Sequence, residues 1–199
     1  MVVGRAVNGG DISFKIADLT PEVEATLVDQ LWAEAIPSGL DPLGWVGGAW
    51  GSKKDYNTRR SQFWRVIRSV SRSIIPEAQP TDWYSHIIWT NLYKVSPHKT
   101  GNPSGHLLRN QFATCVDLLS TEIKLWNPRR ILFLTGHGWA RPFLDKLGCP
   151  VSVGKDSPIE ATALLDHVPI IVAPHPQGKP EKPLAAAIIA RFQSLNTTA

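Results

Sequence analysis

The fold class follows from one segment, Val168-Pro169-Ile170-Ile171-Val172-Ala173-Pro174-His175-Pro176. Its β-branched, apolar run shows no alternation, which is typical of a strand covered on both faces in a parallel sheet. The Pro-His-Pro end must stop that strand, because proline lacks an N–H and restricts the residue before it. His175 is therefore predicted at the carboxyl end of a core strand, where ligands bind in open α/β sheets. A connecting loop that merely contains a histidine is the alternative interpretation.

Other segments extend this pattern along the chain. Apolar runs predict buried strands at residues 1–4, 86–94 and 131–136. Apolar residues that recur every three or four positions predict helices at 20–35, 60–74, 107–126, 139–147 and 181–195. Residues 151–167 fit neither pattern. Because strands alternate with helices, the sequence predicts one domain over residues 1–199, a single three-layer α/β/α domain with a short central parallel sheet.

Two glycine-rich connections separate the first elements. Residues 5–10 predict a turn, since glycine adopts positive φ at little cost. Residues 36–59 predict a long loop that contains Trp45 and Trp50. Loops of this length are usually functional or disordered, and the tryptophans argue against plain disorder.

Composition limits the class of protein. The chain has 199 residues, of which 43% are hydrophobic and 19% charged, as in ordinary globular proteins. No apolar run approaches the ~18 residues of a membrane span, and the first residues lack the basic region of a signal peptide. We therefore expect a cytoplasmic monomer with no membrane partner. Cys115 and Cys149 show no metal-ligand spacing, so we expect two free thiols, no metal and no cofactor.

Charge is distributed unevenly along the chain. Residues 11–35 hold six acids and one base, whereas residues 51–75 hold seven bases and one acid. Arg65, Arg68 and Arg72 form a basic stripe on the helix predicted at 60–74. A positive face of this kind attracts phosphate backbones, although a solvated helix face would give the same pattern.

Polar residues gather at three predicted strand ends: residues 4–8, Asn91 and His175. Asn91 interrupts an apolar strand, and its planar amide could either cap a local turn or pair with the edge of a planar heterocycle such as a pyrimidine. No Walker motif, GxGxxG, nucleophile elbow or HExxH occurs, which argues against nucleotidyl-transfer, dehydrogenase, hydrolase and zincin sites of those kinds.

The order of these features resembles the uracil-DNA glycosylase superfamily. A strand and a glycine turn precede a Trp-rich loop, an Arg-rich helix and a strand that contains Asn91. A long helix, the sequence Asn-Pro-x-x-Ile-Leu-Phe-Leu-x-Gly at 127–136 and a strand that ends in His-Pro follow. The resemblance spans nearly the whole chain and is tightest at 87–136 and 170–179.

The resemblance implies a DNA glycosylase that extracts a base from single- or double-stranded DNA and reads its edge. Residues 3–8 match the first motif, so Gly4, Arg5 and Ala6 would line the base pocket and Asn8 would hold the attacking water. Trp50 would stack on the base and Asn91 would read the pyrimidine edge. His175 would stabilise the anionic leaving base. The loop that follows would enter the DNA with four residues, Gln177, Gly178, Lys179 and Lys182.

Two departures from the family pattern leave other functions open. The acid or amide that normally follows the first glycine of the family is replaced by Arg5, Ala6 and Val7, so Asn8 is the nearest group able to orient water. Gln177 stands where the family usually has serine, and two cysteines cannot supply the four ligands of the thermophilic iron–sulfur branch. The alternatives are a nucleic-acid-binding module that has lost catalysis and another nucleobase- or nucleotide-processing enzyme.

Overall fold

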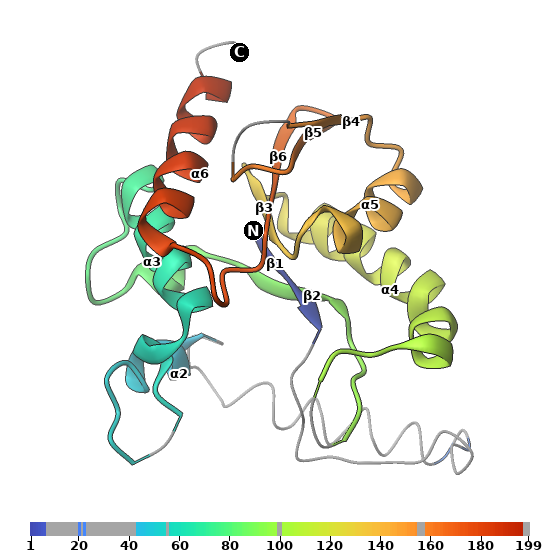
Figure 1. Cartoon of the computed structure of the whole chain (residues 1–199), viewed down its shortest axis with the longest axis horizontal. Helices are drawn as coiled ribbons and strands as arrows, with labels where there is room; N and C mark the ends of the chain where they lie inside the picture. The colour runs from blue at the N-terminus through green and yellow to red at the C-terminus, as the bar shows by residue number, and fades with distance from the viewer. Residues whose placement is uncertain are drawn as a thin grey trace.

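The computed structural model describes residues 1–6, 20, 22, 43–54, 56–98, 101–154 and 158–196. These residues form an α/β fold with a six-stranded mixed sheet of order β2-β1-β3-β6-β5-β4 (Figure 1). The strands are β1 Val2–Ala6, β2 Trp89–Tyr93, β3 Ile131–Leu134, β4 Val151–Val153, β5 Ala161–Leu165 and β6 Val168–Ala173. The helices are α2 Gly44–Gly48, α3 Gln62–Ile74, α4 Gly105–Trp126, α5 His137–Lys146 and α6 Glu181–Asn196, with short 3-10 turns η2 Thr58–Arg60 and η3 Trp83–His86.

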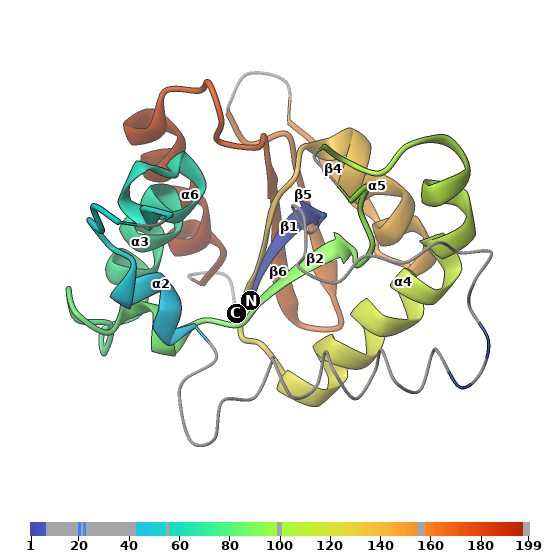
Figure 2. The same ribbon diagram turned by 90° about the horizontal axis from the view of Figure 1, so that it is seen from below.

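Helices cover both faces of the sheet. Figure 2 shows α2, α3 and α6 on one side and α4 and α5 on the other. In β6, Ile171 and Ala173 join the core under α3 and α6, whereas Ile170 and Val172 join the core under α4 and α5. The apolar run that lacks alternation is thus explained, because successive side chains enter two different cores.

The prediction of a wholly parallel sheet is wrong at one edge. Strands β2, β1, β3 and β6 are parallel, but β5 pairs antiparallel with both β6 and β4. Only Asp166 and His167 connect β5 to β6, and Asp166 has a φ of 53°. A two-residue connection with positive φ makes a hairpin, whereas a parallel pair needs a long crossover. Residues 151–167, which fitted neither pattern, therefore supply the antiparallel edge.

Several predicted boundaries need correction. Strand β1 runs to Ala6, which pairs with Tyr93, so Arg5 and Ala6 belong to the strand and not to a turn. Trp126, the last residue of the helix that recurring apolar residues predict at 107–126, is 57% exposed and does not belong to the core face of α4. The loop expected over 36–59 contains α2 and η2 in its described part. The helix expected at 20–35 and Asn8 fall outside the described residues, except for Thr20 and Glu22.

Close packing fixes the position of the Trp-rich segment. A Cβ atom on Gly47 would lie 2.1 Å from the ring of Tyr84, so only glycine allows α2 to approach η3 this closely. This contact holds Trp45 of α2 beside Trp64 and Trp89. Both cysteines are buried free thiols. Among the helices described here, none has the length and apolarity needed to cross a bilayer.

Candidate functional site

A pocket of about 710 Å³ is lined by the second half of β1, by Trp89 and Asn91 of β2 and by the segment that follows β6. The structure brings six of the predicted site residues to its walls, namely Gly4, Arg5, Ala6, Asn91, His175 and Gln177. It adds eight further described residues, namely Trp45, Tyr56, Ser61, Phe63, Trp64, Trp89, Gly101 and Asn102. A pocket therefore lies at the part of the sheet where the sequence analysis predicts ligand binding.

Asn91 lies at the floor of this pocket with only 7% of its surface exposed. It is paired with Gly4 across β1 and β2, and a Cβ atom at position 4 would lie 2.3 Å from its Oδ1. Within the described part of the chain, the side-chain amide has no hydrogen-bond partner. Because Asn91 lines the pocket, this amide is available to a ligand.

Trp89 supplies a second unpaired group beside the first. Its indole Nε1 is buried and has no partner among the described residues. The same ideal Cβ position on Gly4 lies 3.6 Å from this nitrogen, so the Trp89 N–H and the Asn91 amide flank one spot. An N–H donor and an amide together present donors and an acceptor to a planar ligand.

His175 contributes a neutral ring with a defined tautomer. The backbone N–H of Gln177 donates to its Nδ1 at 3.3 Å, so the neutral imidazole carries its hydrogen on Nε2. Burial lowers the pKa of His175, and the nearby positive charge of Arg5 lowers it further. At neutral pH the ring is thus an uncharged Nε2–H donor.

Aromatic rings form the sides of the pocket. Phe63 is stacked on His175 with ring centroids 5.9 Å apart and 16° between the planes. Trp45, Trp64 and Trp89 pack edge to face or tilted, with centroids 5.2 to 6.3 Å apart. Such walls favour a flat, unsaturated ligand, because stacking needs a π-face on both partners.

Arg5 also lines the pocket, near enough to His175 for its charge to act on that ring. Its Nε donates to the carbonyl of Thr135 at 2.6 Å, and its guanidinium lies 5.6 Å from the ring centre of Trp139. Burial lowers the pKa of Arg5 and the carboxylate of Glu160 partly opposes that shift. No aspartate or glutamate is found among the described residues that line the pocket. The pocket is therefore rich in hydrogen-bond donors and carries a positive charge.

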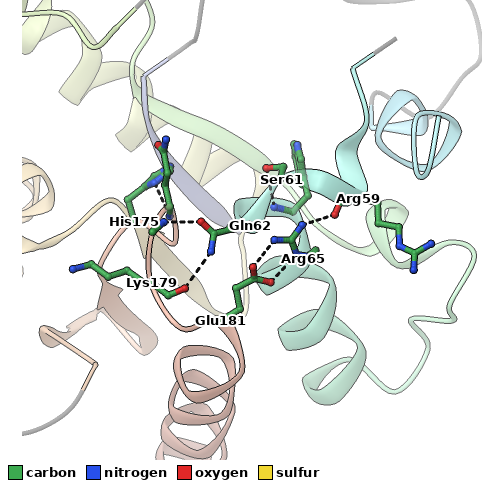
Figure 3. Close-up of polar contacts among 10 residues, drawn as sticks. Arg59, Ser61, Gln62, Arg65, His175, Lys179 and Glu181 are labelled. Carbon is green, nitrogen blue, oxygen red and sulfur yellow. Dashed lines mark hydrogen bonds and ion pairs between the residues drawn. The ribbon is translucent and has the colours of Figure 1, made fainter. Parts of the chain in front are cut away.

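The loop that carries His175 is fastened to α3 (Figure 3). Gln62 accepts a hydrogen bond from the N–H of Gly178 at 2.6 Å and donates to the carbonyl of Lys179 at 3.2 Å. Three residues further along α3, Arg65 binds both carboxylate oxygens of Glu181 at the start of α6, its Nε at 2.7 Å. These contacts, which come from two successive turns of α3, hold the His175 loop in place.

A second hollow of about 870 Å³ adjoins the first. The two share Tyr56, Ser61, Phe63, His175 and Gln177. The second hollow adds two basic side chains, Lys53 and Arg60. A ligand that fills the pocket can therefore continue into a basic groove.

Some predicted site residues lie elsewhere. Trp50, expected to stack on a base, does not line the pocket; it packs against Trp83 at 5.7 Å and under the guanidinium of Arg68 at 5.0 Å. Arg65 is bound by Glu181, so its charge is already neutralised within the protein. Arg72, like Lys179 and Lys182 of the His175 loop region, is exposed. Asn8 lies outside the described residues.

Sequence reasoning missed Phe63, Gln62 and Trp89. Phe63 is one of the apolar residues that recur along the helix predicted at 60–74, and this spacing alone does not separate a wall of a pocket from a core residue. Trp89 offered a usable signal, because residues i and i+2 of a strand face the same side and Asn91 is its i+2 neighbour.

Comparison with known proteins leaves the site to be interpreted on its own chemistry. A scan against protein-family models found no match, and searches of curated proteins and of solved structures found none either.

Proposed function

We propose that this chain is a base-excision DNA glycosylase of the uracil-DNA glycosylase kind, which hydrolyses the N-glycosidic bond of uracil or another damaged base. One observation carries the proposal: the buried, unpaired indole N–H of Trp89 and the amide of Asn91, a residue that is only 7% exposed, line an aromatic pocket beside the His175 ring. A planar heterocycle with alternating donors and acceptors is the ligand that such groups complement.

The arrangement suits extraction of a base from DNA. Phe63 and the tryptophan walls replace the stacking that the base loses, and Asn91 pairs with its Watson–Crick edge. Phe63 takes the stacking role that the sequence had given to Trp50. The four parallel strands with helices on both faces also agree with the architecture that the resemblance implies.

His175 serves the chemical step. The bond from C1′ to the base breaks with its electron pair moving to the ring, water adds its oxygen to C1′, and a proton from that water ends on the base. The neutral Nε2–H of His175 and the positive charge of Arg5 stabilise the anionic ring that forms first. Asn8 is the proposed holder of the water.

An oligonucleotide panel tests this proposal. Single- and double-stranded substrates with uracil, hypoxanthine or xanthine are incubated with the protein, and abasic sites are cleaved with alkali.

His175→Ala should lower the single-turnover rate by about 10² to 10³, the range for one preorganised stabiliser. Asn91→Asp should lose selectivity as well as rate. Asn8→Ala should slow cleavage while DNA affinity stays nearly unchanged, and Trp126→Ala, at the far end of α4, should match the wild type.

A binding module without catalysis is the second candidate. It is favoured by the lack of any carboxylate among the described residues of the pocket, since a carboxylate commonly activates water. Binding of DNA without cleavage of any substrate on the panel would support this candidate and refute excision.

A further inference from the structure

The groove beside the pocket carries features that excision of a single base does not require. Tyr56 is 59% exposed and Trp45 is 45% exposed, although both are large aromatic side chains. Their ring centroids are 6.4 Å apart, so they form one aromatic rim at the mouth of the pocket. Exposed aromatic clusters of this kind usually mark a binding surface.

Tyr56 lies where two hollows meet. It lines the pocket together with Asn91 and also lines the basic groove together with Lys53 and Arg60. Both basic side chains are exposed, and no acid is found among the described residues that line this groove. An aromatic face between a base-sized pocket and two cations matches the repeat of a polynucleotide, in which each base is followed by a phosphate.

Hydrogen bonds anchor the described residues on both sides of Tyr56. Asn57 accepts hydrogen bonds from the N–H groups of Gly51 and Arg59, both at 3.0 Å, and donates to the carbonyl of Ser52 at 2.9 Å. The buried hydroxyl of Thr58 donates to the carbonyl of Val46 at 2.8 Å. Because ordering a surface on binding costs entropy, these existing hydrogen bonds reduce the cost of binding at this rim.

We propose that this surface selects single-stranded DNA, with one base in the pocket, the neighbouring base stacked on Tyr56 and their phosphates at Lys53 and Arg60. The inference rests on the proposed function, because it assumes that the pocket takes a nucleobase. An exposed ring can stack only on a base whose face is free, and in a duplex both faces are covered by neighbouring pairs. Single strands present such faces without the cost of opening a helix.

Fluorescence anisotropy with an undamaged labelled oligothymidine tests the inference without requiring cleavage. We expect the single strand to bind roughly tenfold more tightly than a duplex of the same length. Tyr56→Ala and Tyr56→Leu should each weaken single-strand binding by roughly tenfold, about the contribution of one stacked base. Tyr56→Phe keeps the aromatic face and should bind like the wild type. Lys53→Ala and Arg60→Ala should each reduce the slope of log K against log salt by about 0.7.

Matched controls and a separate assay keep the outcomes distinct. Trp126→Ala removes an aromatic side chain that is 57% exposed on α4, and it should not change binding. Equal affinity for duplex and single strand, or wild-type affinity of both Tyr56→Ala and Tyr56→Leu, would overturn the inference and leave excision standing. If single-strand binding depends on Tyr56 but no lesion is cleaved, excision fails and the inference stands.

Discussion

Gly4 is the residue on which the geometry of Asn91 depends most directly. An added Cβ would lie 2.3 Å from Asn91 Oδ1, which is closer than any real contact. Gly4→Ala should therefore destabilise the fold by about 1–3 kcal/mol, as overpacking of a core usually does. Asn91→Ala removes the atom that clashes, so the double variant should be more stable than the sum of the two single changes predicts. Urea unfolding of the four proteins measures this difference, and additive free energies would contradict the proposed contact.

His175 gives the site a pH dependence whose direction follows from its pKa. Because burial and Arg5 hold the pKa below the ordinary 6.5, the folded state binds fewer protons at this ring than the unfolded state does. The stability that the folded state gains from the lowered pKa of His175 is therefore fully present at neutral pH. It falls as the pH drops below about 6.5 and levels off below the folded pKa.

The measurement is the melting temperature of the wild type and of His175→Gln between pH 8 and pH 5. The wild type should lose more stability than the variant on acidification, because glutamine does not titrate. Parallel profiles for the two proteins would show that His175 titrates alike in the folded and unfolded states, contrary to this expectation.

At the scale of elements, the buried strands and long helices were predictable because their patterns are local. In β3 and β6 a continuous apolar run reflects burial on both faces, and in α6 the spacing of Leu184, Ile188 and Phe192 reflects one buried face. The hairpin edge was not predictable in this way. Strand β4 is only three residues long and mostly exposed, so its burial pattern carries little information.

The candidate site was predictable where it sits on strand ends and not where it sits on packed loops. Gly4 and Asn91 are paired neighbours on parallel strands, and His175 follows the carboxyl end of a third strand of the same parallel set. Trp45 and Tyr56 reach the pocket through the packing of α2 against Tyr84 and the hydrogen bonds of Asn57, neither of which has a periodic signal. Sequence therefore located the pocket but not its aromatic walls.

At the scale of the whole molecule, folding pairs or covers part of the basic side chains that the sequence concentrates in one segment, while the net charge stays the same. The chain has a formal net charge of +4, with the bases of residues 51–75 as its densest cluster. Arg65 is held by Glu181 and lowers the pKa of that carboxyl, while Arg68 lies over Trp50. The exposed cations that remain for phosphate include Lys53 and Arg60 of the groove and Lys179 of the His175 loop, together with Lys54, Arg59 and Arg72 elsewhere in the cluster.

Glu181→Gln tests this redistribution of charge. The change breaks the ion pair, releases the guanidinium of Arg65 beside the His175 loop and removes an acid from the first turn of α6. Stability should fall by about 1 kcal/mol or less, since the pair is partly exposed and the acid also favours the helix N-terminus.

Affinity for DNA should rise, and the slope of log K against log salt should steepen by about 0.7 to 0.9 if Arg65 gains one phosphate. Glu77→Gln alters the net charge equally at an exposed position outside the pocket and the groove, so it serves as the control and should leave the slope unchanged. Equal salt slopes for Glu181→Gln and Glu77→Gln would mean that Arg65 is not a latent phosphate contact, and the DNA backbone would then pass away from Arg65.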